Sequence, residues 1–399
     1  MIIYCRRCVL PHTKPDLYID EAGICSACRY FENRKEVDWE KRESELREVF
    51  DRYRAKDNKH WDCVIPVSGG KDSTFQVLKV LQYGMRPLCV TATTCDLSEI
   101  GRKNIENLKN AGVDYIEFTA NPTIRKKLNR LALIEVGDIS WPEHVSIFTV
   151  PIIMAVKFEI PLIIWGENSQ NEYGGPGAAA KNNYLTRRWL EEFGGLLGLR
   201  VADLVNYGFS EKDLIPYTYP SDEELKRVGV TGVFLGYYLP WHGFRNALVA
   251  QAHGFRPHSD RVEGSIVNYE NIDNYQVGIH DYFKFLKFGF SRASDIGSMY
   301  IRRNIMTRSE VLKLVKERDG KFPWHYLNKP LDEILKPLDM SVAEFIRVCD
   351  DFSNKKLFKI DKNGNLLKDK FGNLEKINDD NISQVAFSEN IVTDEIKLN

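Results

Sequence analysis

The 399-residue sequence lacks a long hydrophobic run. A membrane-spanning helix needs about 18 or more consecutive apolar residues, and the most apolar stretch, residues 145–165, is interrupted by Lys157, Glu159 and Pro161. The start of the chain also lacks the charged segment and apolar core of a secretory signal peptide. We therefore expect a cytoplasmic protein without a membrane partner, whose cysteines stay reduced.

The sequence also lacks an excess of charge of either sign. Its 55 Lys and Arg residues nearly balance 56 Asp and Glu residues, which gives a formal net charge of -1. Nucleic-acid-binding proteins usually carry a basic surface, so we expect no nucleic-acid partner. Hydrophobic residues make up 43% of the chain, which is enough for one sizeable domain with one or two smaller ones.

Four of the eight cysteines form two Cys-x-x-Cys pairs near the start of the chain. The first motif contains Cys5 and Cys8, and the second contains Cys25 and Cys28. This spacing is typical of a four-cysteine zinc site. Two disulfides are the alternative, which a reducing compartment disfavours. Because four thiolates leave no open coordination position, we predict that the Zn²⁺ is structural.

The most informative stretch is Ser68-Gly-Gly-Lys-Asp-Ser73, between an apolar run and residues at helical spacing. The N-terminus of a helix favours anions, and glycines let the backbone approach them closely, so this loop is predicted to bind phosphate. A Walker A motif is excluded, because Asp72 rather than Ser or Thr follows Lys71. The serine acylase motif is disfavoured, because the chain lacks Ser-Asp-Asn and Lys-Thr-Gly. A simple turn without a ligand is the remaining alternative.

Strand and helix patterns alternate from this loop onward. Strands are predicted at residues 63–67, 87–93, 114–119 and 161–165, with helices between them. This order predicts an α/β fold with a mostly parallel sheet and ligands beyond the carboxyl ends of the strands. Thr91 at the end of the second strand and Gly166 and Glu167 after the fourth are therefore candidate site residues. An ordinary strand threonine and an Asn/Gly-rich connection are the alternatives.

The loop resembles the PP-loop of the ATP pyrophosphatase superfamily, whose members cleave ATP between the α and β phosphates. Together with the cysteine pairs, Trp165-Gly-Glu-Asn-Ser-Gln170, Phe290-Ser-Arg-Ala-Ser-Asp295 and Ile301-Arg-Arg303, it makes the chain resemble the N-acetyl sugar amidotransferases of bacterial surface-polysaccharide and nonulosonic acid biosynthesis. The resemblance implies a zinc ribbon (residues 1–34), a connecting helix (35–58), a PP-loop domain (59–306) and a helical and hairpin extension (307–399).

The resemblance also implies an activity. The enzyme would use ATP to adenylate the acetamido group of a nucleotide sugar, and ammonia would replace the oxygen to give an acetamidino group, with release of AMP and pyrophosphate. The implied cofactors are ATP, Mg²⁺ and structural Zn²⁺. Because the chain shows no glutaminase arrangement of its own, ammonia is expected from separate glutaminase and cyclase-like subunits.

Roles follow for individual residues. Lys71 is expected to balance charge on the phosphates, and Asp72 or Glu167 to help hold Mg²⁺. The other expected ATP contacts are Ser68, Gly69, Gly70, Ser73, Thr91 and Gly166. Side chains that suit a nucleotide sugar, by hydrogen bonding, charge or ring stacking, are those of Asn168, Gln170, Lys181, Trp241, Arg292 and Arg302. A surface or core position is the alternative for each of these six.

Two other functions remain open. A PP-loop tRNA thiolase also adenylates a carbonyl and needs a reactive thiol, for which Cys95 is the candidate and Cys89 a neighbour; buried structural cysteines are the alternative. The second open function is a non-catalytic ATP-binding scaffold for a glutaminase. We predict no second metal, because His253 and His258 lack a carboxylate or cysteine at ligand spacing.

Overall fold

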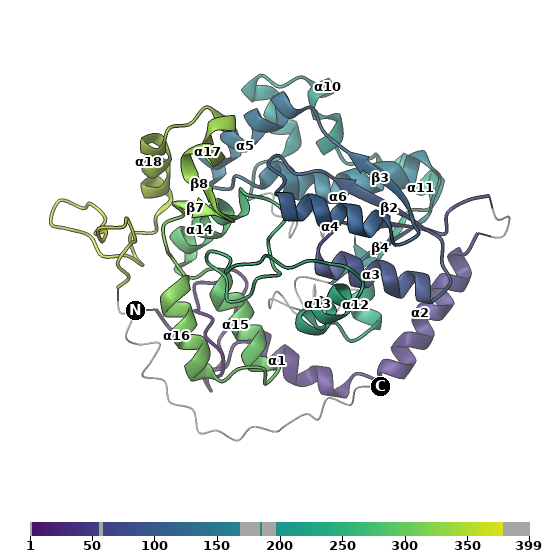
Figure 1. Ribbon diagram of the computed structural model, residues 1–399, viewed down its shortest axis with the longest axis horizontal. Coiled ribbons are helices and arrows are strands. Elements are labelled where there is room, and N and C mark those ends of the chain that lie inside the picture. The colour runs from purple at the N-terminus through teal and green to yellow at the C-terminus, as the bar shows by residue number, and fades with distance from the viewer. Residues whose placement is uncertain (1, 56–58, 168–183, 186–196, 378–399) are drawn as a thin grey trace.

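The computed structural model describes residues 2–55, 59–167 and 197–377, and the backbone of residues 184–185. Its centre is a parallel sheet (Figure 1) made of β1 (Cys63–Pro66), β2 (Pro87–Ala92), β3 (Asp114–Phe118), β4 (Leu162–Trp165) and β6 (Thr231–Phe234). The strands lie in the order β3-β2-β1-β4-β6, and the short β5 (Tyr184–Leu185) pairs antiparallel with β6 at the edge. The predicted α/β fold with a mostly parallel sheet is therefore confirmed.

Helices cover both faces of this sheet, which explains why its inner strands β1 and β4 are apolar throughout. One face is covered by α2 (Trp39–Tyr53), α3 (Lys71–Gln82) and α4 (Glu99–Lys109), and the other by α6 (Trp141–Lys157) and α11 (Asp222–Val228). In β1, Cys63 and Ile65 belong to the first core and Val64 to the second. Successive strand side chains point to opposite faces, so the inner strands of a sheet covered on both faces are apolar at nearly every position, whereas the edge strand β3 carries Asp114 and Glu117.

The order of the strands reverses between β1 and β4. From β1 the sheet grows through β2 to β3 on one side, and the chain then returns to place β4 and β6 on the other. In open parallel sheets, ligands bind beyond the carboxyl ends of the strands at this kind of switch point. The segments that leave β1 and β4 there are residues 67–70 and 166–167.

The sequence predicts the boundaries of the first half well but misses β6. Ser98 caps α4 by accepting a hydrogen bond from the Gly101 N–H group, as expected for a helix that begins there. The strand β6 has only four residues, one of them glycine. Such a segment is too short for a reliable alternation pattern.

A second core lies beside the sheet region, at the left of Figure 1. It contains α14 (Val277–Phe288), α15 (Arg292–Arg302), α16 (Arg308–Arg318), α17 (Leu331–Leu335) and α18 (Val342–Phe352). Thr307 and Glu310 form a capping box at the start of α16. The core includes Phe283 and Phe285 of α14 as well as Phe345 of α18, so hydrophobic packing continues across residue 307.

None of the helices in the described part of the chain combines the length and the hydropathy that crossing a membrane requires.

Candidate functional site

The glycine loop (residues 68–73) joins β1 to the first turn of α3. Gly70 is the N-terminal cap of α3, and no side chain in the described part of the chain caps this end. Ser68 Oγ accepts a hydrogen bond from the Gly70 N–H group at 3.3 Å, and Ser73 Oγ donates to the Gly70 carbonyl at 3.0 Å. The two serines therefore shape the loop, and the helix end keeps the N–H groups and dipole that suit an anion.

The backbone at Gly69 permits only glycine. Its φ is +81°, in the left-handed region that side chains disfavour. A Cβ atom there would lie 2.7 Å from the backbone nitrogen of Ile105 in α4. The loop is therefore in close contact with α4, and an added side chain there would require a shift of the backbone.

Lys71 lies between two carboxylates. Its side chain is only 5% exposed and forms ion pairs with Asp72 and with Glu270 Oε1, the latter at 2.7 Å. The second Asp72 oxygen accepts a hydrogen bond from Asn246 Nδ2 at 2.8 Å. Burial by itself lowers the pKa of Lys71. The negative charges of Asp72 and Glu270 raise it by more than burial lowers it, so the pKa of Lys71 lies well above its usual value. The ammonium group is therefore firmly charged beside the helix N-terminus.

Glu270 and Asn246 are site residues that the sequence did not reveal. Asn246 lies in α13 (Gly243–Ala252), and Glu270 lies in a segment without regular structure. Next to Glu270, the ring of Tyr269 has its centroid 5.9 Å from Lys71 Nζ, and its hydroxyl bonds to that of Tyr300 in α15. No local pattern marks these positions, because only the tertiary fold brings them to the loop.

The segment after β4 is held by close backbone packing. The Gly236 N–H group donates to the Gly166 carbonyl at 3.0 Å. A Cβ atom at Gly166 would lie 3.3 Å from the ring of Trp241. That ring is 4% exposed and packs edge-on against Phe75 of α3, with 5.5 Å between centroids. Trp241, predicted to contact the sugar, thus forms a buried wall between α3 and the segment that leads into Glu167.

Of five further predicted residues, the structure describes Thr91 and Glu167 only. Thr91 Oγ donates to the Val67 carbonyl at 2.6 Å and bonds to the Tyr115 hydroxyl, which ties β2 and β3 to the start of the glycine loop. Glu167 lies half-buried after β4. Asn168, Gln170 and Lys181 lie outside the described residues.

Arg292 belongs to a chain of polar contacts that leads back to Lys71. Its guanidinium group holds both oxygens of Asp281, at 3.1 and 3.3 Å. Asn271 Nδ2 donates to the same carboxylate at 3.0 Å, and Asn271 follows Glu270 directly. Arg302 lies ten residues further along α15, about 15 Å away along the helix axis at ~1.5 Å per residue. Arg292 is thus linked to the glycine loop, whereas Arg302 lies at the other end of its helix.

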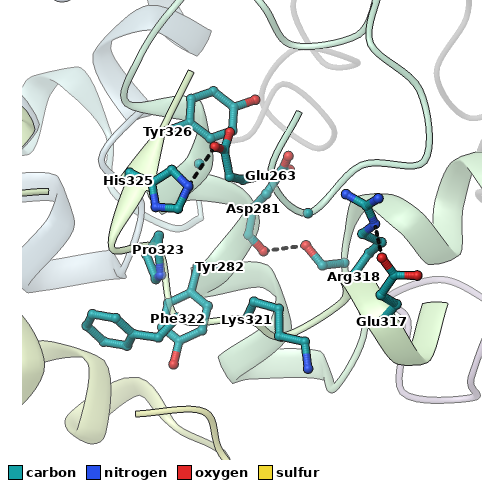
Figure 2. A pocket seen from close by; sticks show the side chains of 14 residues that line it. Glu263, Asp281, Tyr282, Glu317, Arg318, Lys321, Phe322, Pro323, His325 and Tyr326 are labelled. Atoms are coloured by element: carbon teal, nitrogen blue, oxygen red, sulfur yellow. Dashed lines mark hydrogen bonds and ion pairs between the residues drawn. The ribbon is translucent and has the colours of Figure 1, made fainter. Parts of the chain in front are cut away.

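A cavity of about 260 Å³ lies beside Asp281. Figure 2 shows the ion pair between Glu263 and His325, whose Oε1 and Nε2 atoms lie 3.1 Å apart. Ser291 Oγ donates a hydrogen bond to the Asp281 carbonyl at 2.7 Å. The lining combines charged and aromatic side chains, among them Lys321, Tyr282, Phe322 and Tyr326. A pocket with this mixed lining suits a polar ligand that carries a ring.

The thiols of Cys95, which follows β2, and of Cys89, within β2, are not activated. Burial and the charge of Glu143 raise the pKa of Cys95 to about 11. Burial and the charge of Asp114 raise the pKa of Cys89 to about 12. Because the thiolate is the nucleophilic form, both groups are protonated and weakly reactive near neutral pH.

The four N-terminal cysteines meet in one buried cluster. Their Sγ atoms all lie within 4.8 Å of one another, with 3.6 Å between Cys8 and Cys25 and 4.0 Å between Cys5 and Cys28. Tetrahedral zinc with bonds of about 2.3 Å needs sulfur atoms about 3.8 Å apart. The N–H groups of Cys8 and Cys25 point at Cys5 Sγ, at 3.5 and 3.3 Å. This cluster fits a structural Zn²⁺ ion.

The cysteine cluster also contacts the second core. The Val9 N–H group donates to Ser298 Oγ in α15 at 3.3 Å, and Arg308 Nε donates to the Cys8 carbonyl at 3.1 Å. Phe290 belongs to the same hydrophobic cluster as the cysteines. A metal ion there would therefore brace the start of the chain against α15 and α16.

The second core carries a similarity to a known family. Residues 263–371 match the family model described as "LPS biosynthesis protein WbpG-like, C-terminal domain". The matched region contains Glu270, Arg292 and most of the second core, and it covers 109 of 399 residues. Among curated proteins, none matches the sequence. A solved structure of NMN synthetase from Francisella tularensis is similar with 12% identity and a TM-score of 0.24, over 53% of this chain and 96% of that chain.

Proposed function

We propose that this chain is an ATP-dependent amidotransferase of bacterial surface-polysaccharide biosynthesis, with a PP-loop as its ATP site. In this proposal it converts the acetamido group of a nucleotide-linked N-acetyl sugar into an acetamidino group. The observation that carries the proposal is the position of Lys71. Its ammonium group is charged, almost fully buried and next to the open N-terminus of α3 at the switch point of the sheet.

The charges around Lys71 indicate that Mg²⁺ accompanies the nucleotide. One positive charge on Lys71 faces two negative ones, on Asp72 and Glu270. A triphosphate would be repelled by that surplus unless a cation came with it. Mg²⁺ prefers carboxylate and phosphate oxygens, so Asp72 or Glu167 would hold it while Lys71 turns toward the phosphates.

The reaction has two steps. In the first, the amide oxygen of the acceptor attacks the α-phosphorus of ATP, an O–P bond forms, and the bond to the β-phosphate breaks to release pyrophosphate. In the second, ammonia attacks the resulting imidate carbon, the C–O bond breaks to release AMP, and one proton leaves the nitrogen. Lys71 and the N–H groups of the glycine loop would stabilise the negative charge that develops on the departing pyrophosphate.

The acceptor is proposed to bind on the side of Arg292. The family description attached to residues 263–371 concerns lipopolysaccharide biosynthesis, which supports a sugar acceptor. Arg292 and the cavity beside Asp281 both lie within this region. A guanidinium group has five N–H donors, of which Asp281 occupies two on Arg292, so Arg292 is proposed to contact the diphosphate of a nucleotide sugar while it stays anchored to Asp281. Separate glutaminase and cyclase-like subunits would supply the ammonia.

The experiment that tests this function measures the mass of the acceptor. Purified protein is incubated with ATP, Mg²⁺, ammonium and UDP-N-acetyl sugars, and UDP-glucose serves as the matched acceptor without an acetamido group. We expect AMP and the mass change for oxygen replaced by NH only with acetylated acceptors. Lys71→Ala should lower the rate by on the order of 10²- to 10³-fold, whereas Lys79→Ala on the same helix should leave it unchanged. A rate of AMP formation that is the same with and without the acceptor and ammonium would refute the proposal.

The thiolase and the scaffold remain outcomes of the same experiment. The raised pKa of Cys95 disfavours a thiolase, which needs a thiolate. Tight, salt-sensitive binding of tRNA would favour that enzyme nevertheless. A scaffold would form no AMP with any acceptor and would still bind its glutaminase after Lys71→Ala.

A further inference from the structure

Three metal-ligating side chains meet outside the glycine loop and the cysteine cluster. Asp138 lies between α5 (Pro122–Val136) and α6, His144 lies in the first turns of α6, and His280 lies in α14. One ligand atom from each lies within 4.8 Å of the other two. The sequence predicts no second metal, because His253 and His258 lack a carboxylate or cysteine at ligand spacing. The fold instead joins histidines from two distant helices.

The geometry within this cluster differs between the two histidines. His280 Nδ1 lies 2.8 Å from Asp138 Oδ1, which also accepts the Ser140 N–H group at 2.9 Å. His144 Nδ1 lies 3.3 Å from Asp138 Oδ2. This nitrogen is buried and forms no hydrogen bond with any residue that the structure describes. A plain hydrogen-bonded ion pair therefore accounts for His280 but not for His144.

The separation between His144 and Asp138 suits coordination to a shared ion, whereas His280, at 2.8 Å from Asp138 Oδ1, would have to move slightly outward to admit one. Nitrogen and oxygen ligands bind Zn²⁺ at about 2.0–2.2 Å, so two such ligands in a tetrahedron lie about 3.3–3.6 Å apart. The distance from His144 to Asp138 has this value, and Asp138 presents one oxygen to each imidazole. The Ser140 N–H group fixes the carboxylate, as outer hydrogen bonds do in metal sites.

The residue types narrow the metal and its coordination. Two imidazoles with one carboxylate suit zinc, iron(II) or manganese rather than Mg²⁺ or Ca²⁺. Three protein ligands leave at least one position open, in contrast to four cysteines. The side chains of His144 and His280 are 31% and 26% exposed, so the cluster lies close to the protein surface.

We propose that Asp138, His144 and His280 bind a divalent transition-metal ion at a site separate from the four cysteines. The ion would lie close to the acceptor side, because His280 is followed by Asp281, which holds Arg292 and Asn271. The binding of the metal does not depend on the proposed amidotransferase reaction.

Metal analysis of the full-length protein tests this site. The purified chain is equilibrated with excess Zn²⁺, passed into metal-free buffer and analysed by mass spectrometry for zinc. Two ions per chain are expected, one on the cysteines and one on the new site. Co²⁺ that enters the new site should show d–d absorption without thiolate-to-metal charge transfer. One zinc per chain, or charge transfer from a second cobalt, would overturn the proposal.

Substitutions locate the second ion. His144→Gln and His280→Gln, separately and together, are expected to reduce the zinc content by one ion per chain. His253→Gln removes an exposed histidine outside the cluster and should leave the content unchanged. Thermal unfolding checks that each variant is folded. Retention of both ions by the folded double variant would show that the second ion binds elsewhere and would overturn the proposal.

Discussion

Glu270 Oε1 lies 2.7 Å from Nζ of Lys71. The two residues come from different parts of the molecule, since Lys71 begins a helix of the sheet region and Glu270 lies in the region that matches the polysaccharide-biosynthesis family model. The contact therefore joins the proposed ATP site to the proposed acceptor side. Asn271 extends this link to Asp281 and Arg292.

Glu270→Gln tests whether this carboxylate positions Lys71. The variant keeps the shape of the side chain but removes its charge, so Lys71 retains only Asp72 as an anionic partner. A hydrogen bond between charged groups contributes about 1.5–3 kcal/mol, and we expect kcat/KM for ATP to fall about tenfold or more, mainly through a higher KM. Steady-state kinetics measures this change, and Glu106→Gln, at an exposed side chain of α4, serves as the control. An unchanged KM for ATP would contradict the positioning role.

Gly69→Ala and Gly112→Ala separate two costs of adding a methyl group. Both glycines have nearly the same positive φ, +81° and +82°, but only at Gly69 would a Cβ atom collide with the backbone of Ile105. The backbone cost should be about 1–2 kcal/mol at both positions, and the collision should add about 1–3 kcal/mol at Gly69. Urea unfolding measures the difference. Equal destabilisation of the two variants would show that the loop can move away from α4.

Cys5→Ser and Cys95→Ser separate the structural cysteines from a reactive one. Cys5→Ser should remove one zinc ion per chain and lower the free energy of unfolding by at least about 2 kcal/mol, because the cluster braces α15 and α16. Cys95→Ser should keep the metal and change the rate of AMP formation by less than about twofold, as expected for a protonated, partly buried thiol. If Cys95→Ser lost AMP formation and Cys5→Ser retained it, the result would favour the thiolase alternative.

Glu117→Gln should destabilise the protein in a pH-dependent way. Hydrogen bonds from Arg102 lower the pKa of Glu117 from 4.5 to about 2, with a further contribution from Lys109. Because the folded-state pKa is depressed, the stabilisation is present above pH 4.5 and is lost as the pH falls toward 2. Arg102 is 43% exposed, so solvent limits the effect to about 1 kcal/mol at most.

A comparison with Glu48→Gln, at an exposed side chain of α2, isolates the pH-dependent contribution of Glu117. Urea unfolding at several pH values should show the Glu117→Gln difference near neutral pH and its disappearance in acid. A difference that stays constant between pH 7 and pH 3 would contradict the assigned pKa. It would indicate that packing, rather than charge, stabilises Glu117.

Local patterns were sufficient to predict the sheet and the glycine loop. Both follow from contiguous residues, since a strand buried on both faces is apolar throughout and the loop combines two glycines with a helix start. The spacing of the cysteines likewise predicts that Cys5, Cys8, Cys25 and Cys28 come together, and they do.

The partners of these residues could not be predicted in the same way. Glu270 and Asn246 reach Lys71 only through the tertiary fold, and neither belongs to a local motif. His144 and His280 meet at Asp138, with 5.0 Å between the centroids of their rings, although they are far apart in the sequence. The sequence predicts that Trp241 contacts the sugar, with a core position as the alternative, and its ring is buried against Gly166. Sequence spacing does not encode such long-range contacts.

The most direct measurement follows a heavy oxygen isotope placed in the acetamido group of the acceptor. Adenylation of the amide oxygen transfers that atom to phosphorus, so all of the label should appear in AMP after one turnover with ATP and ammonium. Mass spectrometry of AMP and pyrophosphate reads the outcome. Label in AMP, and none in pyrophosphate, is the predicted result. Unlabelled AMP together with an acceptor that keeps its labelled oxygen would contradict activation of the acetamido group at the glycine loop.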